Sequence, residues 1–297
     1  MAEIRVGVSG WSYRHWRRRF YPEGLPQRRE LEYASARFGS IEINGTFYGL
    51  TRASTVRNWH AQTPADFVFA VKGSRFITHN KKLSDPEAAL ANFFASGILE
   101  LGEKLGPILW QLSPAIRFDP DRLDHFLGLL PHDTEAARRL ARHHDERVGD
   151  PGFGPEGRRT IRHALEIRHP SFFSAEAVDI VRRHGVALAV SHSAAWEYTE
   201  EVTADFVYVR LHGPRALYDS RYRPDELAHW AERVRRLHAG RQPVDARRIT
   251  SLPLPSRRKR DVFLYFDNDG HAYAPEQALE MQRLLGLDQG PTEESGA

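Results

Sequence analysis

The sequence predicts an α/β fold, a single (β/α)8 barrel of the TIM type, on three observations. Short apolar runs recur eight times along the 297 residues, with stretches of helical patterning between them. Eight strands that alternate with helices over about 280 residues are typical of a closed parallel barrel. Polar residues gather near the carboxyl ends of the runs, where barrel enzymes place their catalytic groups. An open doubly wound sheet is the alternative, but it usually has fewer strands, and the chain has neither Gly-x-Gly-x-x-Gly after the first run nor a P-loop.

The elements follow from runs rich in Val, Ile, Leu and Phe. Strands are expected at 4–10, 40–47, 67–73, 107–112, 163–169, 186–192, 206–213 and 261–268. Helices are expected at 29–38, 52–61, 86–104, 121–130, 175–184 and 224–238.

Two basic segments are insertions in addition to the alternating strands and helices. Residues 131–162 add a charged helix and a Gly/Pro loop before the fifth strand, and residues 239–260 are expected to form a mobile basic loop between the last two strands. The barrel domain is therefore expected to span residues 1–288, followed by a disordered tail at 289–297.

The composition narrows the function classes. The absence of cysteine excludes disulfides, thiolate metal sites and cysteine nucleophiles. No apolar run reaches the length of about 18 residues that a membrane span needs, and no secretory signal precedes the first strand, so a cytoplasmic protein without a membrane partner is expected. Only five of the 42 basic residues are lysines, but no aromatic-interleaved motif accompanies the arginines, so nucleic-acid binding is weakly supported. The oligomeric state is not predictable from these features.

Strand periodicity collects the polar residues at one place. Because successive strand residues alternate between the interior and the helix layer, polar side chains from six strands are expected to point inward near the carboxyl ends. They are Glu42, Asn44, Lys72, Gln111, Glu166, Arg168, Arg210, His212 and Asp267. A buried network in which Glu42 and Glu166 neutralise the cations is the alternative interpretation. Such networks are seldom more stable than apolar packing, and the clustering at one end favours a functional site.

Several motifs together resemble those of the domain of unknown function 72 family, the YecE-like proteins. The motifs are "GVSGWSYRHWRRRFYP", "EINGTFYGL", "FAVKGSRFITH", "LGPILWQL", "LEIRHPSF", "YVRLHG" and "YFDNDGHAYAP", which span residues 4–286 in order. The resemblance implies a TIM-type barrel with a polar cluster at the strand ends, and it supplies no activity. The chain has Thr51-Arg52 where many relatives have a proline, and its two basic insertions exceed the family core.

The inward carboxylates predict general acid–base catalysis. Glu166 is expected to be the general base or acid with Glu42 as its partner, because Lys72 nearby would drive the two carboxyl pKa values apart. His212 and His79, the latter in the loop after the third strand, are the candidate proton carriers. A hydrogen bond that fixes the loop is the alternative role for His79.

The inward cations predict recognition of a phosphate or carboxylate group. Lys72, Arg168 and Arg210 would form the anion clamp. The other expected substrate-binding residues are Asn44, Gln111, Asp267 and Asn268, with Trp11 and Tyr13 as a stacking wall for a ring or sugar. The two aromatic residues would otherwise plug the top of the barrel.

No metal and no cofactor are expected. Glu42, Glu166, His169, His212 and Asp267 could surround Mn²⁺ or Zn²⁺, but the chain lacks the usual His-x-His and His-Glu-x-x-His motifs, and the nearby cations would repel the ion. The predicted function is therefore that of a metal-independent hydrolase, lyase or isomerase acting on a small anionic or nucleotide-like substrate. The alternatives are a non-catalytic ligand-binding or nucleic-acid-associated protein, and a metal-dependent hydrolase.

Overall fold

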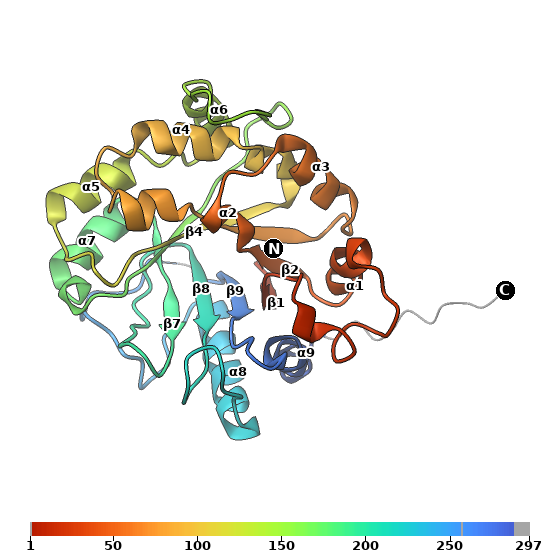
Figure 1. Ribbon diagram of the computed structural model, residues 1–297. Helices are drawn as coiled ribbons and strands as arrows, with labels where there is room; N and C mark the ends of the chain where they lie inside the picture. The colour runs from red at the N-terminus through yellow and green to blue at the C-terminus, as the bar shows by residue number, and fades with distance from the viewer. Residues whose placement is uncertain (1, 257, 288–297) are drawn as a thin grey trace.

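The strands of the computed structural model, which describes residues 2–256 and 258–287, form a ring of parallel neighbours around one axis (Figure 1). The order within the sheet is β6-β5-β4-β3-β2-β1-β9-β8-β7, and the strands that are neighbours in this order run parallel to each other. β6 and β7 are two halves of the sixth strand, separated by Ala189, whose N–H donates to the Leu165 carbonyl at 2.9 Å. The described residues therefore build a TIM-type α/β barrel, as the sequence predicts.

Each strand overlaps one predicted apolar run, and most end before the run does. The strands are β1 Ile4–Ser9, β2 Ser40–Ile43, β3 Val68–Lys72, β4 Leu105–Gln111, β5 His163–Glu166, β6 Ala187–Leu188, β7 Val190–His192, β8 Phe206–Leu211 and β9 Asp261–Phe266. As a result Asn44, Arg168, His212 and Asp267 follow their strands instead of lying within them.

Helices cover the outside of the ring (Figure 1). They are α1 Glu30–Ser35, α2 Gly45–Tyr48, α3 Ala53–Ala61, α4 Glu87–Ala95, α5 Pro120–Gly128, α6 Thr134–Ala141, α7 Ala175–Arg183, α8 Pro224–His238 and α9 Tyr273–Leu285. The helix expected at 86–104 is split into α4 and a 3₁₀ segment, Ile98–Lys104, because Gly97 between them has a φ of 94°, which an α-helix cannot accommodate. Asp119, Asp133 and Ser174 begin α5, α6 and α7 by accepting hydrogen bonds from backbone N–H groups of the first turn.

Two apolar layers lie on opposite faces of the ring. Alternate strand residues such as Ile41, Phe69 and Leu165 pack against the helices. The other strand positions fill the interior, where small and large side chains share the space: Ala70, Leu109, Ala164, Ala187, Ala189, Tyr208, Phe263 and Tyr265. The apolar interior therefore occupies the barrel below the charged residues at its carboxyl end.

The two predicted insertions differ in structure. α6, in the first insertion, packs against α4 on the outside of the barrel (Figure 1). The second insertion has no helix or strand among 239–256 and 258–260. Its chain is nevertheless attached to the barrel, because Glu201 accepts hydrogen bonds from the N–H groups of Ile249 and Thr250, both at 3.0 Å. The tail expected at 289–297 lies outside the described residues. Among those that are described, no helix is long and apolar enough to span a bilayer.

Candidate functional site

Six charged or titratable side chains meet at the carboxyl end of the barrel. They lie within one residue of the ends of β2, β3, β5, β8 and β9, and we call them the carboxyl-end cluster: Glu42, Lys72, Glu166, Arg210, His212 and Asp267. The fold brings them together because strand alternation turns each toward the barrel axis while its neighbours face the helices.

Arg210 is the centre of this cluster and is fully buried. Its Nε and Nη2 donate to the two carboxylate oxygens of Glu42 at 3.1 and 2.7 Å. Its Nη1 donates to Glu166 at 2.8 Å, and Nη2 also donates to Asp267 at 2.9 Å. Burial lowers the pKa of Arg210, but the three carboxylates outweigh it and raise that pKa well above its usual range. The guanidinium is therefore a permanent internal cation, with each of its nitrogens engaged inside the protein.

The two predicted catalytic carboxylates are saturated with hydrogen bonds. Glu42 also accepts from the Ser9 hydroxyl at 2.7 Å and the Tyr208 hydroxyl at 2.6 Å. Glu166 accepts, besides Arg210, the three donors Gln111 Nε2 at 3.1 Å, Arg168 Nε at 2.6 Å and Ser191 Oγ at 3.0 Å. Neither carboxylate is exposed to solvent. Both groups are thus held in fixed positions.

The charges of the cluster set the protonation of its acids. Burial raises the pKa of Glu166, but Arg168 and Arg210 outweigh it, so that this pKa lies well below its usual range. The same balance between burial and Arg210 lowers the pKa of Asp267 to about 2. Burial, followed by the charge of Arg210, lowers the pKa of His212, whose Nδ1 lies 2.9 Å from Asp267. At neutral pH the cluster therefore contains ionised carboxylates, and Glu166 is a weak base.

Lys72 differs from the other members. The residue is only 8% exposed, and its ammonium, which keeps some contact with solvent, makes no hydrogen bond or ion pair with any described residue. The nearest aromatic contact is the ring of Phe47, whose centroid lies 4.4 Å from Nζ. Burial and the charge of Arg210 lower the pKa of Lys72, although Glu42, Asp267 and Glu166 act in the opposite direction. Lys72 is therefore the member of the cluster whose nitrogen has a cation–π contact and no hydrogen-bond or ion-pair partner among the described residues.

Arg168 forms the second cation at the edge of the cluster. Its guanidinium carbon lies 3.5 Å from the centroid of the Trp196 ring, in a cation–π arrangement, while its Nε is bonded to Glu166. The side chain keeps about 10% of its surface exposed. Arg168 is therefore oriented by the last residue of β5 on one side and by the loop after β7 on the other.

His79, Asn44 and Tyr13 lie around the cluster. The His79 ring packs edge-on against Phe47, with 5.1 Å between centroids, and its Nδ1 lies 2.9 Å from the Thr78 hydroxyl. Burial, followed by the charge of Lys72, lowers the pKa of His79. The amide oxygen of Asn44 is buried and accepts no hydrogen bond from the described part of the chain. The Tyr13 hydroxyl donates to the Ser9 carbonyl at 2.7 Å, and burial, then Asp267, raises its pKa.

Trp11 and Asn268 lie away from the cluster. The chain turns at Gly10, whose φ is 82°, and carries the Trp11 ring into the helix layer, where it contacts Trp59 and Phe69. Asn268 is fully buried, and its amide donates to the carbonyl of Ser220 at 3.0 Å and to Gln277 of α9 at 2.7 Å. These contacts account for both residues as parts of the packing.

Three further residues near the cluster were not anticipated from the sequence. Trp196 covers Arg168 and contacts His212 with 5.1 Å between ring centroids, and Tyr218 contacts the same imidazole at 5.6 Å. Asp269 accepts from the indole N–H of Trp16, and burial raises its pKa to about 6. All three follow strand ends, so their position in the chain is the one signal that could have found them.

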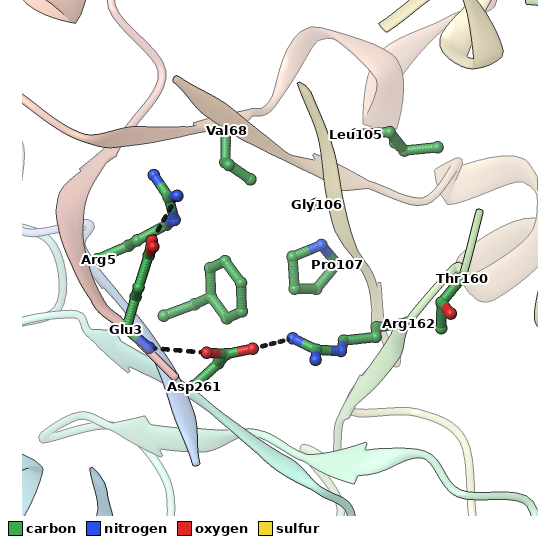
Figure 2. Close-up of a pocket in the computed structure, with 10 residues that line it drawn as sticks. Glu3, Arg5, Val68, Leu105, Gly106, Pro107, Thr160, Arg162 and Asp261 are labelled. Atoms are coloured by element: carbon green, nitrogen blue, oxygen red, sulfur yellow. Dashed lines mark hydrogen bonds and ion pairs between the residues drawn. The ribbon is translucent and has the colours of Figure 1, made fainter. Parts of the chain in front are cut away.

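Two cavities lie outside the cluster. One, of about 340 Å³, opens at the amino end of the barrel, where Arg5 contacts Glu3 at 2.6 Å and Arg162 contacts Asp261 at 2.5 Å (Figure 2). The other, of about 450 Å³, lies beside the end of β7 and the first turns of α8, and includes His192. Within residues 2–256 and 258–287, no three His, Cys, Asp or Glu side chains are arranged to hold a metal ion.

Comparisons with known proteins place this geometry in a family. The sequence matches the family model described as "Protein of unknown function DUF72" over residues 5–296. The UPF0759 protein YunF of Bacillus subtilis (strain 168) is 23% identical over 300 residues, which cover 96% of this chain and 95% of YunF.

Solved structures of DUF72 family proteins share the fold. The protein from Thermotoga maritima MSB8 is 26% identical and superimposes with a TM-score of 0.70, covering 95% of this chain and 99% of that chain. A protein from Enterococcus faecalis V583 is 18% identical with a TM-score of 0.67, covering 97% of both chains.

Proposed function

The chain belongs to the DUF72 family, and from the geometry of its own residues we propose that it is an enzyme for a small anionic substrate. The reaction would take place at the carboxyl end of the barrel by general acid–base chemistry without a bound metal. The substrate class is a molecule with a phosphate or carboxylate group, and the reaction class is hydrolysis, elimination or isomerisation.

One observation carries this proposal: the ammonium of Lys72 belongs to a largely buried side chain, keeps contact with solvent, and has no hydrogen-bond or ion-pair partner among the described residues. A charge that loses most of its contact with water is destabilising unless an opposite charge compensates it. Arg168 lies at the same edge and keeps part of its surface exposed. An anion bound between these two cations would give Lys72 the partner that the protein does not provide.

The proposal assigns the roles differently from the simplest interpretation of the sequence. Because Glu42 and Glu166 are saturated and Glu166 is strongly acidic, they serve to hold Arg210 and Arg168 in place. The proton transfer falls to His79, which is kept neutral by burial and by Lys72 and whose Nε2 has no partner in the described residues. The cations that surround the carboxylates also repel a divalent metal ion, which supports a metal-independent reaction.

Ligand binding without turnover is the second candidate. The specific observation in its favour is that both buried carboxylates are already engaged with Arg210. A site of this kind could recognise an anion without any free carboxylate to act on it.

Thermal unfolding in the presence of inorganic phosphate tests the anion site. Phosphate should raise the melting temperature of the wild-type protein, because a ligand that binds only the native state stabilises it. Lys72→Met should lose that shift, and Lys82→Met, at an exposed lysine, should keep it. Sodium chloride at matched ionic strength is the salt control. An equal phosphate shift in Lys72→Met would show that the anion binds elsewhere.

Turnover separates the two candidates. A panel of small phosphate and carboxylate esters should yield a substrate for the wild-type protein, and His79→Asn should lower its turnover roughly a hundredfold or more. The same variant should keep the phosphate-induced shift. An unchanged rate in His79→Asn would remove His79 from the mechanism, and the absence of any substrate would favour the binding protein.

A further inference from the structure

Two lysines are buried in the described part of the chain, and the surroundings of their ammonium groups differ. Lys104 Nζ donates to the carbonyls of His60 and Thr63 at 2.7 and 2.8 Å and lies 3.1 Å from the Thr63 hydroxyl, so its three N–H bonds have three acceptors. Lys72 is buried to a similar extent, and its amine has no such acceptor in the described residues. The first arrangement is that of a structural lysine. The second leaves the nitrogen available to a ligand.

We propose that Lys72 is a nucleophile that captures the carbonyl group of a small anionic aldehyde or ketone as an imine. This inference rests on the proposed function, because it places the substrate in the same site and names its reactive group. The geometry supports it in two ways: the amine is at a strand end, and its nitrogen has no hydrogen-bond or ion-pair partner among the described residues and keeps contact with solvent. Amines activated in this way are surrounded by apolar groups or lie beside another cation.

Burial, followed by the charge of Arg210, lowers the pKa of Lys72, so a larger fraction of this amine is unprotonated and reactive than in an exposed lysine. The acidic groups Glu42, Asp267 and Glu166 act against this shift, but each of them is paired with Arg210. Burial is the largest cause that lowers the pKa of the nearby His79, so its imidazole is neutral and one ring nitrogen can accept a proton.

The reaction balances without an oxidant or reductant. The lone pair of Nζ forms a bond to the carbonyl carbon, and the π-electron pair of the C=O bond moves to the oxygen. The nitrogen loses one proton to His79, which passes it to that oxygen and makes it a hydroxyl. The carbon–oxygen bond then breaks, the hydroxyl leaves as water with the second nitrogen proton carried by His79, and a neutral C=N bond remains. Arg168, at the edge of the cluster, would hold the anionic group of the substrate.

Trapping with glyoxylate and sodium borohydride tests this proposal. Glyoxylate combines an aldehyde with a carboxylate, and borohydride reduces the imine to a stable carboxymethyl amine that peptide mass spectrometry locates. The chain has only five lysines, at 72, 81, 82, 104 and 259, so each can be followed separately. At neutral pH we expect Lys72 to be labelled several times faster than Lys82 and Lys259, because a lowered pKa leaves a larger fraction of the amine unprotonated.

Two variants and a second probe control the assignment. Lys72→Arg keeps the positive charge and cannot form an imine, so it should lose the fast label and keep the phosphate shift. Lys82→Met should label as the wild type does. Propanal, which has no anionic group, should label Lys72 more slowly than glyoxylate does.

The outcomes distinguish this inference from the proposed function. Phosphate stabilisation together with labelling of Lys72 no faster than that of Lys82 would overturn the imine and leave the anion site intact. Fast labelling of Lys72 by glyoxylate and propanal alike, without phosphate stabilisation, would remove anion recognition and retain the nucleophile.

Discussion

The two ends of the barrel both carry arginine–carboxylate pairs, and the comparison shows how differently the same chemistry can be used. At the amino end, Arg162 and Asp261 form a pair whose side chains are 31% and 22% exposed, beside an open cavity (Figure 2). At the carboxyl end, Arg210, Glu42 and Glu166 are fully buried. Pairs that water reaches contribute little to stability, whereas breaking a fully buried pair strands a charge in the interior.

The two ends also differ in whether every cation has a carboxylate partner. At the amino end, Arg5 and Arg162 each have a carboxylate partner, and Arg5 additionally donates to the carbonyls of Gly39 and Asp66. At the carboxyl end, three carboxylates and three cations would balance, but they are not paired one to one. Arg210 engages all three carboxylates, and Lys72 engages none. The amino end therefore resembles a stabilising face and the carboxyl end a binding site, which agrees with the usual division in such barrels.

The largest effect is expected from removing the centre of the buried cluster. Arg210→Met should lower the free energy of unfolding by about 3–5 kcal/mol, because it leaves Glu42, Glu166 and Asp267 without their common partner. Arg162→Met, the matched change at the amino end, should cost less than about 1 kcal/mol. Urea unfolding measures both.

If Arg210→Met does not fold, Arg210→Lys can replace it in the comparison of the unfolding free energies of the two ends. A lysine retains the charge and loses the bidentate geometry, so its cost should lie between those of the other two variants. Equal costs for Arg210→Lys and Arg162→Met would contradict the distinction between the two ends.

The second largest effect is expected from acid, which should reduce the stability that the carboxyl-end cluster contributes. A carboxyl whose pKa is depressed by folding stabilises the protein above its unfolded pKa and loses that contribution as the pH falls toward the folded pKa. The pKa of Asp267 falls from 3.8 to about 2, which corresponds to about 2 kcal/mol, and the lowered pKa of Glu166 acts with the same sign. Stability should therefore decline as the pH falls from about 4 to about 2.

Asp267→Asn sharpens this test. The variant should show a shallower acid decline than the wild type in unfolding measured at several pH values, because one titrating group of the cluster is gone. Asp261→Asn removes a carboxylate from the amino end and serves as the control. A decline of the same steepness in wild type and Asp267→Asn would show that Asp267 does not titrate as its contacts imply.

Much of the cluster could be predicted because strand geometry is regular. The alternation of inward and outward residues brings Glu42, Lys72, Glu166 and Arg210 to one end of any closed parallel barrel, whatever the loops do. Alternation says nothing, however, about which charge pairs with which. That Arg210 engages three carboxylates depends on atomic distances across the barrel that no sequence pattern encodes.

The loops explain most of what could not be predicted. Trp11 and Asn268 lie next to strand ends, but the turn at Gly10 and the packing of α9 direct them away from the axis. Trp196 reaches Arg168 from the loop after β7. Loop residues have no periodicity, so their direction follows from contacts with residues far away in the chain.

The smallest change in the free energy of unfolding is expected for Lys72→Met, and the sign of that change is informative. Burial and Arg210 lower the pKa of Lys72, so the folded state disfavours its charged form. At neutral pH this group therefore lowers the free energy of unfolding, and that loss fades as the pH rises through the folded pKa. Lys72→Met should therefore leave the free energy of unfolding unchanged or raise it by up to about 1 kcal/mol at neutral pH. The wild type and the variant should converge at alkaline pH. Lys104→Met, which strands the acceptors of His60 and Thr63, should instead lower stability by about 1–3 kcal/mol. A loss of similar size in Lys72→Met would mean that the amine has an internal partner after all, and would remove the physical reason for a ligand at this end of the barrel.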